Sequence, residues 1–264
     1  MWELASSMNN FIDTHTHLHF EDFDKDREAV IARAGEAGVN QIITLGTGLL
    51  SSRESLRIAQ QYPQIFAAAG IHPSEAHSAA PGDEAAIKKL ASEEEKIIAI
   101  GEIGLDFYWD KTYHREQYDM FRTMLKIARE VKLPVVIHNR SAQREMEWFF
   151  QEEGIRALEG VMHCFAGEVL DARFYLDMGL HISFTADITY KNFTRAEVVK
   201  FVPLDRLLLE TDSPFIAPAN SPEKRNEPAN AIRVAEKLAE IHHTTVEEIA
   251  GITTQNARRL FRLV

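Results

Sequence analysis

The sequence predicts an α/β fold, a (β/α)8 TIM barrel formed as a single domain with extra C-terminal helices. Three observations support this prediction. Eight short apolar or β-branched runs recur along the chain, longer stretches with helical spacing separate them, and the 264 residues are close to the roughly 250 that such barrels use. Alternation at this pitch indicates βαβ units and a parallel sheet. A doubly wound open sheet is the less favoured alternative, because open sheets often have fewer strands.

The predicted strands are short segments rich in Ile, Val, Leu, Phe and Thr. In chain order they are Phe11–His17, Gln41–Thr47, Phe66–His72, Ile97–Gly104, Pro134–His138, Gly160–Phe165, His181–Thr185 and Leu207–Asp212.

The predicted helices have apolar residues at spacings of three and four. Between the strands they are Asp26–Ala37, Ser52–Gln61, Asp83–Ala91, Arg115–Val131, Ala142–Glu153, Val169–Met178 and Arg195–Phe201. In the tail we expect Glu227–Ile241, with a Pro in its first turn, and then Thr245–Gly251 and Thr254–Leu263. Thr245 and Glu248 have the spacing of a capping box.

Composition and charge limit where the chain can work. We expect residues 1–10 to be an N-terminal extension, with Met8 as an alternative start, and residues 11–264 to form the barrel domain. A single Cys excludes an intramolecular disulfide framework and favours a reducing, cytoplasmic location. We see no secretory signal, no membrane-spanning run and no evidence of an obligate protein partner. Because the net charge is −11, the chain as a whole does not attract nucleic acid, so a nucleic acid substrate would need a local binding site.

Side chains of the kind that bind metals end five of the eight predicted strands. The first strand contributes two imidazoles on one face, because residues two apart in a strand point the same way. The carboxyl ends of barrel strands form one rim, so we expect all these side chains to converge there. Four His, one Glu and one Asp are too many for one tetrahedral ion and suit two ions that share a carboxylate. A lone strand-end His is more often a packing or surface residue. The predicted ligands are His15, His17, Glu102, His138, His163 and Asp212.

Other polar residues near the strand ends carry weaker signals. His72 could contact the substrate or donate a proton, with packing as the alternative. Glu210 lies one layer below Asp212, and Asp13 lies below His15, so we expect both carboxylates to orient ligands. Cys164 is out of phase with the strand-end ligand before it, which predicts a buried structural Cys that faces the helices.

Basic and aromatic side chains follow several of the strand ends. Arg140 is expected beside the fifth strand's ligand, Lys191 follows the seventh strand and Arg225 follows the eighth. In an acidic chain these cations indicate an anionic substrate, and aromatic rings among them could stack the bases of a single strand. Ordinary loop cations are the alternative interpretation. The further loop residues of this kind are Phe107, Tyr108, Trp109, Lys111, Tyr113, Arg115 and Lys224.

Several motifs together resemble the TatD family of metal-dependent deoxyribonucleases. The resemblance runs from about Phe11 to the end of the chain, and it is the combination that is specific. The motifs are Asp13-Thr14-His15-Thr16-His17-Leu18, Gly70-Ile71-His72-Pro73, Gly101-Glu102-Ile103-Gly104-Leu105-Asp106-Phe107-Tyr108, Ile137-His138, Gly160 to Phe165 (GVMHCF), Leu208-Leu209-Glu210-Thr211-Asp212-Ser213-Pro214 and Arg225-Asn226-Glu227-Pro228.

The resemblance implies a TIM barrel of the amidohydrolase superfamily with a divalent metal site and hydrolysis of DNA, often from the 3′ end. It assigns one ion to His15, His17, Glu102 and Asp212, and the other to Glu102, His138 and His163. It also implies that His72 lies near the substrate phosphate. The sequence departs from the family in two loops, at Asn139-Arg140-Ser141 and at Ser183–Asp187, which bears on the preferred substrate and not on the ligands.

The ligand set predicts a hydrolase that uses two divalent ions, Zn, Mn or Mg. The ions bind phosphate oxygens and activate a water, Asp212 accepts the proton of that water, and Arg140 and Lys191 hold the phosphate. The expected substrate is DNA with single-stranded or frayed ends, cleaved in the 3′–5′ direction. An amidohydrolase or small-ester hydrolase on the same barrel is one alternative, although Glu102 stands where such enzymes often carry a carboxylated Lys. A non-enzymatic metal-binding barrel is the other, and the complete ligand set argues against it.

Overall fold

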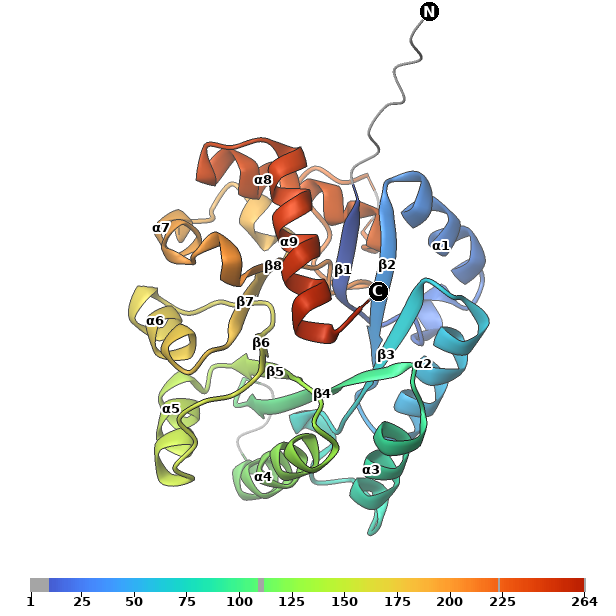
Figure 1. The fold of residues 1–264 in the computed structure, drawn as a ribbon, viewed down its shortest axis with the longest axis vertical. Helices are drawn as coiled ribbons and strands as arrows, with labels where there is room; N and C mark the ends of the chain where they lie inside the picture. The colour runs from blue at the N-terminus through green and yellow to red at the C-terminus, as the bar shows by residue number, and fades with distance from the viewer. Residues whose placement is uncertain (1–9, 109–111, 223, 264) are drawn as a thin grey trace, which may run out of the picture.

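The computed structural model describes residues 10–108, 112–222 and 224–263. Eight parallel strands lie in the order β1 to β8, with helices around them (Figure 1). The strands are β1 (Phe11–Thr16), β2 (Val39–Leu45), β3 (Ile65–Ala69), β4 (Ile97–Asp106), β5 (Val135–Arg140), β6 (Gly160–Met162), β7 (His181–Phe184) and β8 (Leu207–Leu209).

Hydrogen bonds between β1 and the residues that follow β8 close the sheet into a barrel. The Asp212 N–H donates to the carbonyl of His15 at 2.9 Å, and the His17 N–H donates to the carbonyl of Ser213 at 2.7 Å. Thr16 and Ser213 form a parallel bridge. The sequential strand order and this closure confirm the predicted (β/α)8 barrel and exclude the open sheet.

The outer layer contains a helix after each strand. These helices are α1 (Arg27–Glu36), α2 (Leu49–Gln61), α3 (Asp83–Glu93), α4 (His114–Val131), α5 (Gln143–Glu152), α6 (Val169–Asp177), α7 (Ala196–Phe201) and α8 (Ala231–His242). A further helix, α9 (Val246–Phe261), ends the described fold. It is continuous where the sequence predicts two helices, Thr245–Gly251 and Thr254–Leu263, and its predicted capping box is present, with Thr245 Oγ1 accepting the Glu248 N–H at 3.2 Å.

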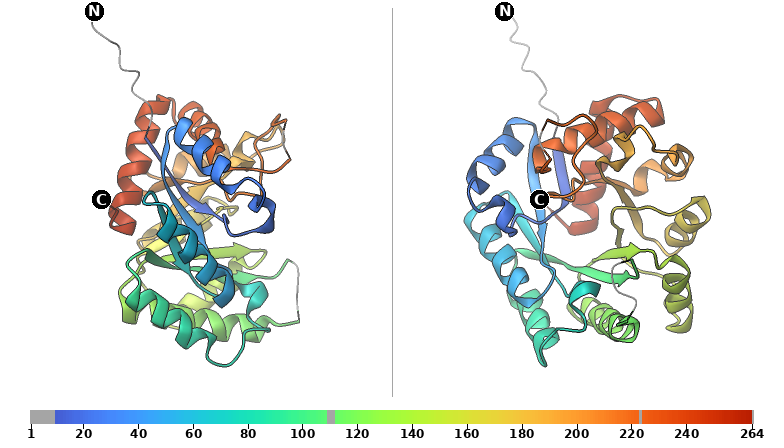
Figure 2. Two further views of the ribbon diagram at one scale, coloured as in Figure 1. Left: turned by 90° about the vertical axis from the view of Figure 1, so that its right-hand side faces the viewer. Right: turned by 180° about the vertical axis from the view of Figure 1, so that it is seen from behind.

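Two apolar clusters form the core. The larger one joins the sheet to the outer helices. The smaller one joins inward side chains such as Ile12, Val136 and Leu208 to Leu260 and Phe261 of α9. Helix α9 therefore plugs one end of the barrel, and Figure 2 shows it (red) on the side opposite the long segment after β8 (orange). This leaves the carboxyl ends of the strands as the end available to a ligand.

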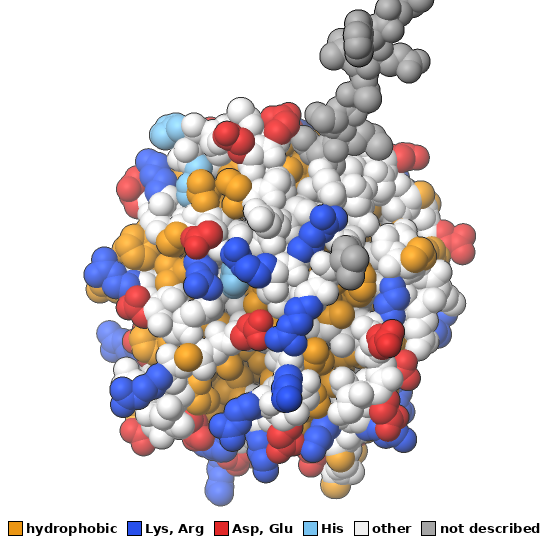
Figure 3. Space-filling view, in the orientation of Figure 1, with side chains coloured by type: hydrophobic (Ala, Val, Ile, Leu, Met, Phe, Trp, Pro, Cys, Tyr) orange, Lys and Arg blue, Asp and Glu red, His pale blue; other side chains and the backbone are white. Residues whose placement is uncertain are grey.

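The face that α9 covers is rich in basic side chains. Lys and Arg gather over its lower part, where α4 and α5 lie (Figure 3). A cavity of about 450 Å³ near Arg206 and Arg259 and another of about 670 Å³ beside α4 open in this region. The cations that line the larger cavity are Arg122, Lys126, Arg129, Lys132, Arg156 and Arg262. None of the helices in the described part of the chain is long and apolar enough to cross a membrane.

Candidate metal centre

Six predicted ligand side chains meet at the open end of the barrel. His15 belongs to β1, Glu102 to β4 and His138 to β5, whereas His163 and Asp212 lie just beyond the short strands β6 and β8. Together with His17, which follows β1, they have 0–15% of their side-chain surface exposed. The structure therefore brings together all six residues that the strand ends predict.

The first group of ligand atoms surrounds one point between β1, β4 and the residues after β8. The Nε2 atoms of His15 and His17 are 3.2 Å apart. Glu102 Oε2 lies 3.4 and 3.5 Å from these nitrogens, and Asp212 Oδ1 lies 3.7 and 3.5 Å from them. Four ligands in a tetrahedron at about 2.0–2.1 Å from a zinc-class ion are separated by roughly 3.3–3.4 Å, so these atoms fit such an ion without large movement.

The second group surrounds the other oxygen of the same carboxylate. Glu102 Oε1 is 2.8 Å from His138 Nδ1 and 2.8 Å from His163 Nε2, and the two nitrogens are 3.2 Å apart. His72 Nε2 approaches the same oxygen at 3.5 Å. Glu102 thus divides its two oxygens between two pairs of imidazoles, as expected of a carboxylate that bridges two cations.

Glycines allow β4 to approach its neighbours closely. Gly104 has a φ of +143°, and a Cβ at this position would overlap the carbonyl oxygen of His138. A Cβ on Gly70 would lie 2.7 Å from the carbonyl carbon of Gly101, next to Glu102. Only glycine fits these contacts, which hold β3, β4 and β5 close enough for Glu102 to reach His138.

A backbone carbonyl and a buried carboxylate lie beside two of the ligand rings and orient them. His17 Nδ1 lies 3.1 Å from the carbonyl of Leu45, which directs its Nε2 toward Glu102. His163 Nδ1 lies 3.4 Å from Glu210 Oε1. The same Glu210 oxygen accepts the Cys164 N–H at 2.7 Å, and its other oxygen accepts the hydroxyl of Ser183 at 2.8 Å.

Asp13 acts on the backbone around the ligands. Its carboxylate accepts the hydroxyl of Thr211 at 2.6 Å, the Thr211 N–H at 2.9 Å and the His15 N–H at 3.3 Å. Burial raises the pKa of Asp13 to about 7, against the opposing effect of these hydrogen bonds. Asp13 therefore ties β1 to the segment that carries Asp212, and it does so through backbone N–H groups and the Thr211 hydroxyl.

Asp106 is a site residue that the strand-end pattern did not single out. Its Oδ2 lies 3.0 Å from His138 Nε2, the ring nitrogen that faces away from Glu102. Its backbone is held by Gln117, which accepts the Asp106 N–H and donates to its carbonyl. A signal existed, because residues 102, 104 and 106 share a strand face, but the predicted strand ends at Gly104 and the actual one continues to Asp106.

The electrostatics of the centre favour an ionised carboxylate among the imidazoles. Burial alone would raise the pKa of Glu102, but its interactions with the surrounding imidazoles, His163 foremost, outweigh burial and hold that pKa well below its usual range. Burial also opposes ionisation of Asp212, and the His17 hydrogen bond with the neighbouring His charges still lowers its pKa. Both carboxylates are thus available as anionic ligands.

His72 is a neutral ring that presents a donor to the site. Burial lowers the pKa of His72 to about 3. Its Nδ1 accepts the Ser74 N–H at 3.1 Å and lies 2.7 Å from the Ser74 hydroxyl. Because Nδ1 accepts a backbone N–H, the proton of the neutral ring is on Nε2, the atom that faces Glu102.

The predicted substrate-binding residues have different surroundings. The Arg140 guanidinium stacks over Tyr108 at 4.0 Å, and Lys191 is exposed after the β7 segment. Arg225 donates to both oxygens of Asp26, at 2.7 and 2.8 Å, so a contact with substrate would compete with this ion pair. Trp109 and Lys111, predicted beside them, lie outside the described residues.

The structure corrects the prediction for Cys164. The side chain is partly exposed, and its Sγ lies 3.7 Å from the hydroxyl of Thr185 in the segment after β7. Strand β6 ends at Met162, and Cys164 has a φ of +45°. The alternation of a strand therefore does not extend to this residue, and it lies at the rim instead of facing the helices.

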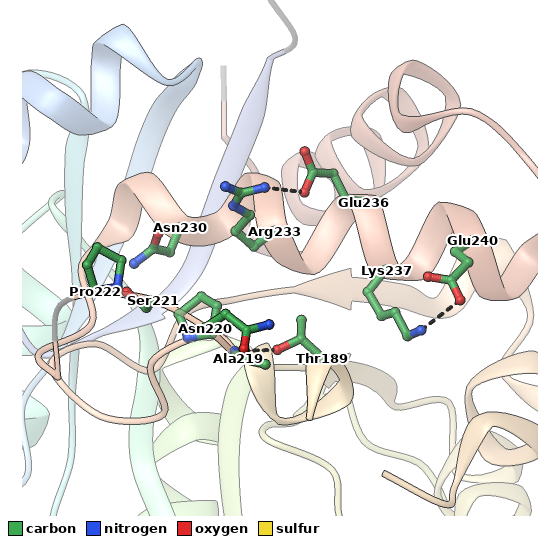
Figure 4. Close-up of a pocket in the computed structure, with 11 residues that line it drawn as sticks. Thr189, Ala219, Asn220, Ser221, Pro222, Asn230, Arg233, Glu236, Lys237 and Glu240 are labelled. Carbon is green, nitrogen blue, oxygen red and sulfur yellow. Dashed lines mark hydrogen bonds and ion pairs between the residues drawn. The ribbon is translucent and has the colours of Figure 1, made fainter. Parts of the chain in front are cut away.

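A separate pocket outside the centre has no comparable ligand set. It has a volume of about 480 Å³ and lies between Thr189, the segment 218–222 and α8 (Figure 4). Its two cations are paired along the helix, Arg233 with Glu236 at 3.0 Å and Lys237 with Glu240 at 2.8 Å. The pocket is accordingly close to neutral, and among the described residues the metal-type side chains gather at the barrel mouth.

Comparison with known proteins identifies the family. The family description "TatD related DNase" matches residues 12–262. The chain belongs to the TatD family. It is 44% identical over 252 residues to the "Uncharacterized metal-dependent hydrolase YabD" of Bacillus subtilis, covering 95% of this chain and 98% of that protein. It is 34% identical over 259 residues to the "3'-5' ssDNA/RNA exonuclease TatD" of Salmonella typhimurium, covering 96% and 99%.

A solved structure shows the same fold. The crystal structure of YJJV, a TatD homologue from Escherichia coli, superposes with a TM-score of 0.91 at 30% identity, over 97% of this chain and all of that one. This TatD protein is therefore a metal-dependent hydrolase of ester bonds on a (β/α)8 barrel, as the sequence predicts.

Proposed function

We propose that this TatD protein is a 3′–5′ exodeoxyribonuclease that uses two divalent ions to hydrolyse phosphodiester bonds at single-stranded or frayed DNA ends. The observation that supports it most is the position of Glu102. One carboxylate oxygen faces the His15 and His17 nitrogens, and the other faces those of His138 and His163. Two ions held about one carboxylate form the arrangement used for in-line displacement at phosphorus.

The proposed ligands divide between the two ions as the two groups of atoms suggest. His15, His17, Asp212 and one Glu102 oxygen would hold the first ion, and His138, His163 and the other Glu102 oxygen would hold the second. The high share of imidazole nitrogen favours Zn²⁺ or Mn²⁺. Mg²⁺ is a further candidate, because metal availability as well as affinity decides which ion a site takes in a cell.

When bound, such ions neutralise charge on the phosphate and lower the pKa of the attacking water. Asp212, with 13% of its side chain exposed at the mouth, accepts the proton of that water. The Nε2–H of His72 donates to a phosphate oxygen, and it can do so over a wide pH range because its ring is neutral. Arg140 and Lys191 hold neighbouring phosphates from the rim. Asp106 keeps the His138 ring in position.

A DNA end is the substrate that best suits the surroundings of the centre. Relatives from Salmonella typhimurium and Erwinia tasmaniensis, 34% and 35% identical, bear the name "3'-5' ssDNA/RNA exonuclease TatD". The mouth has aromatic rings beside a few cations, which favours unstacked bases and a short contact footprint. The net charge of −11 disfavours an extended binding interface with duplex DNA.

A substrate screen tests this proposal. Metal-stripped protein is re-loaded with Zn²⁺, Mn²⁺ or Mg²⁺ and assayed on single-stranded DNA, duplex DNA, RNA, simple phosphate esters and amides. We expect metal-dependent release of mononucleotides from the 3′ end of single-stranded DNA, and blocking that end should stop it. Cleavage mainly within intact duplex, or turnover of amides alone, would contradict the proposal. The Glu102→Gln protein is the control for a contaminating nuclease.

A further inference from the structure

Exposed apolar side chains concentrate at one end of the molecule. Among the described residues, seven large apolar side chains are exposed, and six of them lie between a strand and the first turn of the next helix, at the mouth of the barrel. The exception is Trp148 on α5. Scattered exposed apolar residues are ordinary, but a concentration marks a contact surface. The six are Leu50, Tyr108, Tyr113, Leu170, Tyr190 and Phe215.

Phe215 is the member of this set closest to the metal centre by ring contact. It is 51% exposed, and its ring centroid is 6.1 Å from that of His17. Its backbone N–H donates to the carbonyl of Asp212 at 2.9 Å. The ring is therefore tied to the segment that carries one proposed ligand and lies beside another.

The Phe20 ring packs edge-on against Phe215 and provides a second aromatic surface beside it. The two rings are 5.6 Å apart with an interplanar angle of 75°, so together they form a corner. Phe20 also stacks on His17 at 5.1 Å and contacts the His19 ring at 4.5 Å. These contacts with His17 and His19 hold the Phe20 ring in place, so little conformational entropy is lost when a planar ligand enters the corner.

A nucleobase is the ligand whose chemistry fits this corner. The corner offers the aromatic surface of Phe20 and Phe215, and stacking of this kind tolerates any base. On the far side of the mouth, Arg140 over Tyr108 offers a cation for a phosphate. A protein partner or a second copy of the chain would also cover apolar surface, but neither requires rings adjoining the ligands of a hydrolytic centre.

We propose that Phe215, backed by Phe20, stacks the base of the nucleotide next to the cleaved phosphate and so positions the end of the strand at the centre. This inference rests on the proposed function, because it names the part of a nucleic acid substrate that the rim holds. Phe215 is a specificity-determining residue in this account, since it would favour a strand end that carries a base over one that lacks it.

A double comparison of ring and base tests the proposal. The wild-type protein, Phe215→Ala and Phe215→Trp are assayed on a short oligothymidine and on the same oligonucleotide with abasic terminal nucleotides. We expect Phe215→Ala to lower kcat/KM on the base-bearing strand by about 5- to 150-fold, the range for stacking one base on an aromatic ring, and to change the abasic strand little. Phe215→Trp should keep the preference for the base. Trp148→Ala is the matched control, because Trp148 is an aromatic residue with a similar exposed fraction, 53%, away from the mouth.

The outcomes separate this inference from the proposed function. An equal loss on both strands, or no loss on either, would overturn the role of Phe215 while leaving the nuclease activity in place. If the wild type hydrolyses neither strand, the proposed function fails, and binding to hydrolysis-resistant phosphorothioate strands still decides the inference. Equal affinity of the wild type for base-bearing and abasic strands would overturn it. So would a Phe215→Ala protein that only loses self-association, which would assign the surface to a second copy.

Discussion

Glu102 is the residue that joins the two groups of ligand atoms in the proposed metal centre. A buried carboxylate is costly unless cations or donors surround it, and Glu102, 3% exposed, has histidine nitrogens from β1, β5 and the segments after β3 and β6 within 3.5 Å. Asp212 contacts the first pair of these rings, His15 and His17. The two carboxylates therefore have different roles, one joining the two groups of ligands and one facing the mouth.

Substitutions at these two carboxylates should separate metal binding from proton transfer. Asp212→Asn keeps an oxygen for the metal but removes the base, and loss of a general base typically costs about 10²–10⁴-fold in rate. Glu102→Gln should lose metal as well as turnover, because a neutral amide bridges two cations poorly. Elemental analysis and single-turnover rates on both purified proteins check this. Near wild-type turnover by Asp212→Asn with its metal bound would remove Asp212 from the base role.

Asp106→Asn tests the hydrogen bond that orients His138. Loss of such a carboxylate typically lowers metal affinity or activity by about 10–100-fold, and we expect weaker metal binding together with slower turnover. Asp177→Asn is the control, because Asp177 is an exposed acid at the end of α6, away from the mouth. Unchanged metal affinity and rate in Asp106→Asn would show that His138 does not need this partner.

The residues of the candidate site could be predicted from the sequence wherever the end of a strand could be predicted correctly. The ligands are recognisable because a barrel collects its strand ends at one rim, whatever the details of each strand. Asp106 and Cys164 show the limit, since their positions depend on β4 running two residues further and on β6 stopping early. Phe20 and Phe215 meet only in three dimensions, through segments about 195 residues apart, and nothing in their local sequence marks the contact.

At the scale of elements, α9 shows packing overriding a local signal. The sequence predicts two helices, the first ending at Gly251, and glycine in a helix costs about 1 kcal/mol relative to alanine. The helix continues because Leu260 and Phe261 on its last turns fill the end of the barrel against Ile12 and Leu208. Burial of these side chains outweighs the local cost of one glycine.

Two substitutions on α9 should shift stability in opposite directions. Phe261→Ala removes a side chain that is 2% exposed, and we expect it to lower the free energy of unfolding by about 3–5 kcal/mol. Gly251→Ala should raise it by about 0.5–1 kcal/mol, because a Cβ there meets nothing within 4 Å. Urea unfolding of both proteins measures the changes. A Phe261→Ala protein as stable as the wild type would contradict the role of α9 as a plug.

At the scale of the whole molecule, the two ends of the barrel differ in charge and in the kinds of side chain that they carry. The α9 end is rich in Lys and Arg, whereas the open end holds the metal-type side chains and the exposed aromatic rings. His181, at the start of β7, is 4% exposed and lies near Arg206 and Arg259. The titration of His181 should therefore make the free energy of unfolding depend on pH, at a position away from the proposed metal centre.

His181 should make the fold less stable in acid. Burial, with the charges of Arg206 and Arg259, lowers the pKa of His181 to about 4 from 6.5. Between these values the unfolded chain binds a proton that the folded chain does not, so stability falls as the pH drops from about 6.5 to 4, by up to roughly 3 kcal/mol. Urea unfolding across this range checks it, and His181→Gln should flatten this part of the profile. An identical slope in the variant would assign the acid sensitivity to other groups.

Counting the bound metal tests most directly whether this TatD protein holds two divalent ions about Glu102. Protein stripped with a chelator is re-loaded with Zn²⁺ or Mn²⁺, freed of excess ion and assayed for metal per chain by elemental analysis. We predict two ions per chain at saturation and loss of hydrolysis after chelation. A chain that binds no divalent ion at saturation, or that hydrolyses its substrate fully after exhaustive chelation, would contradict the account; one ion per chain would contradict the bridging role of Glu102.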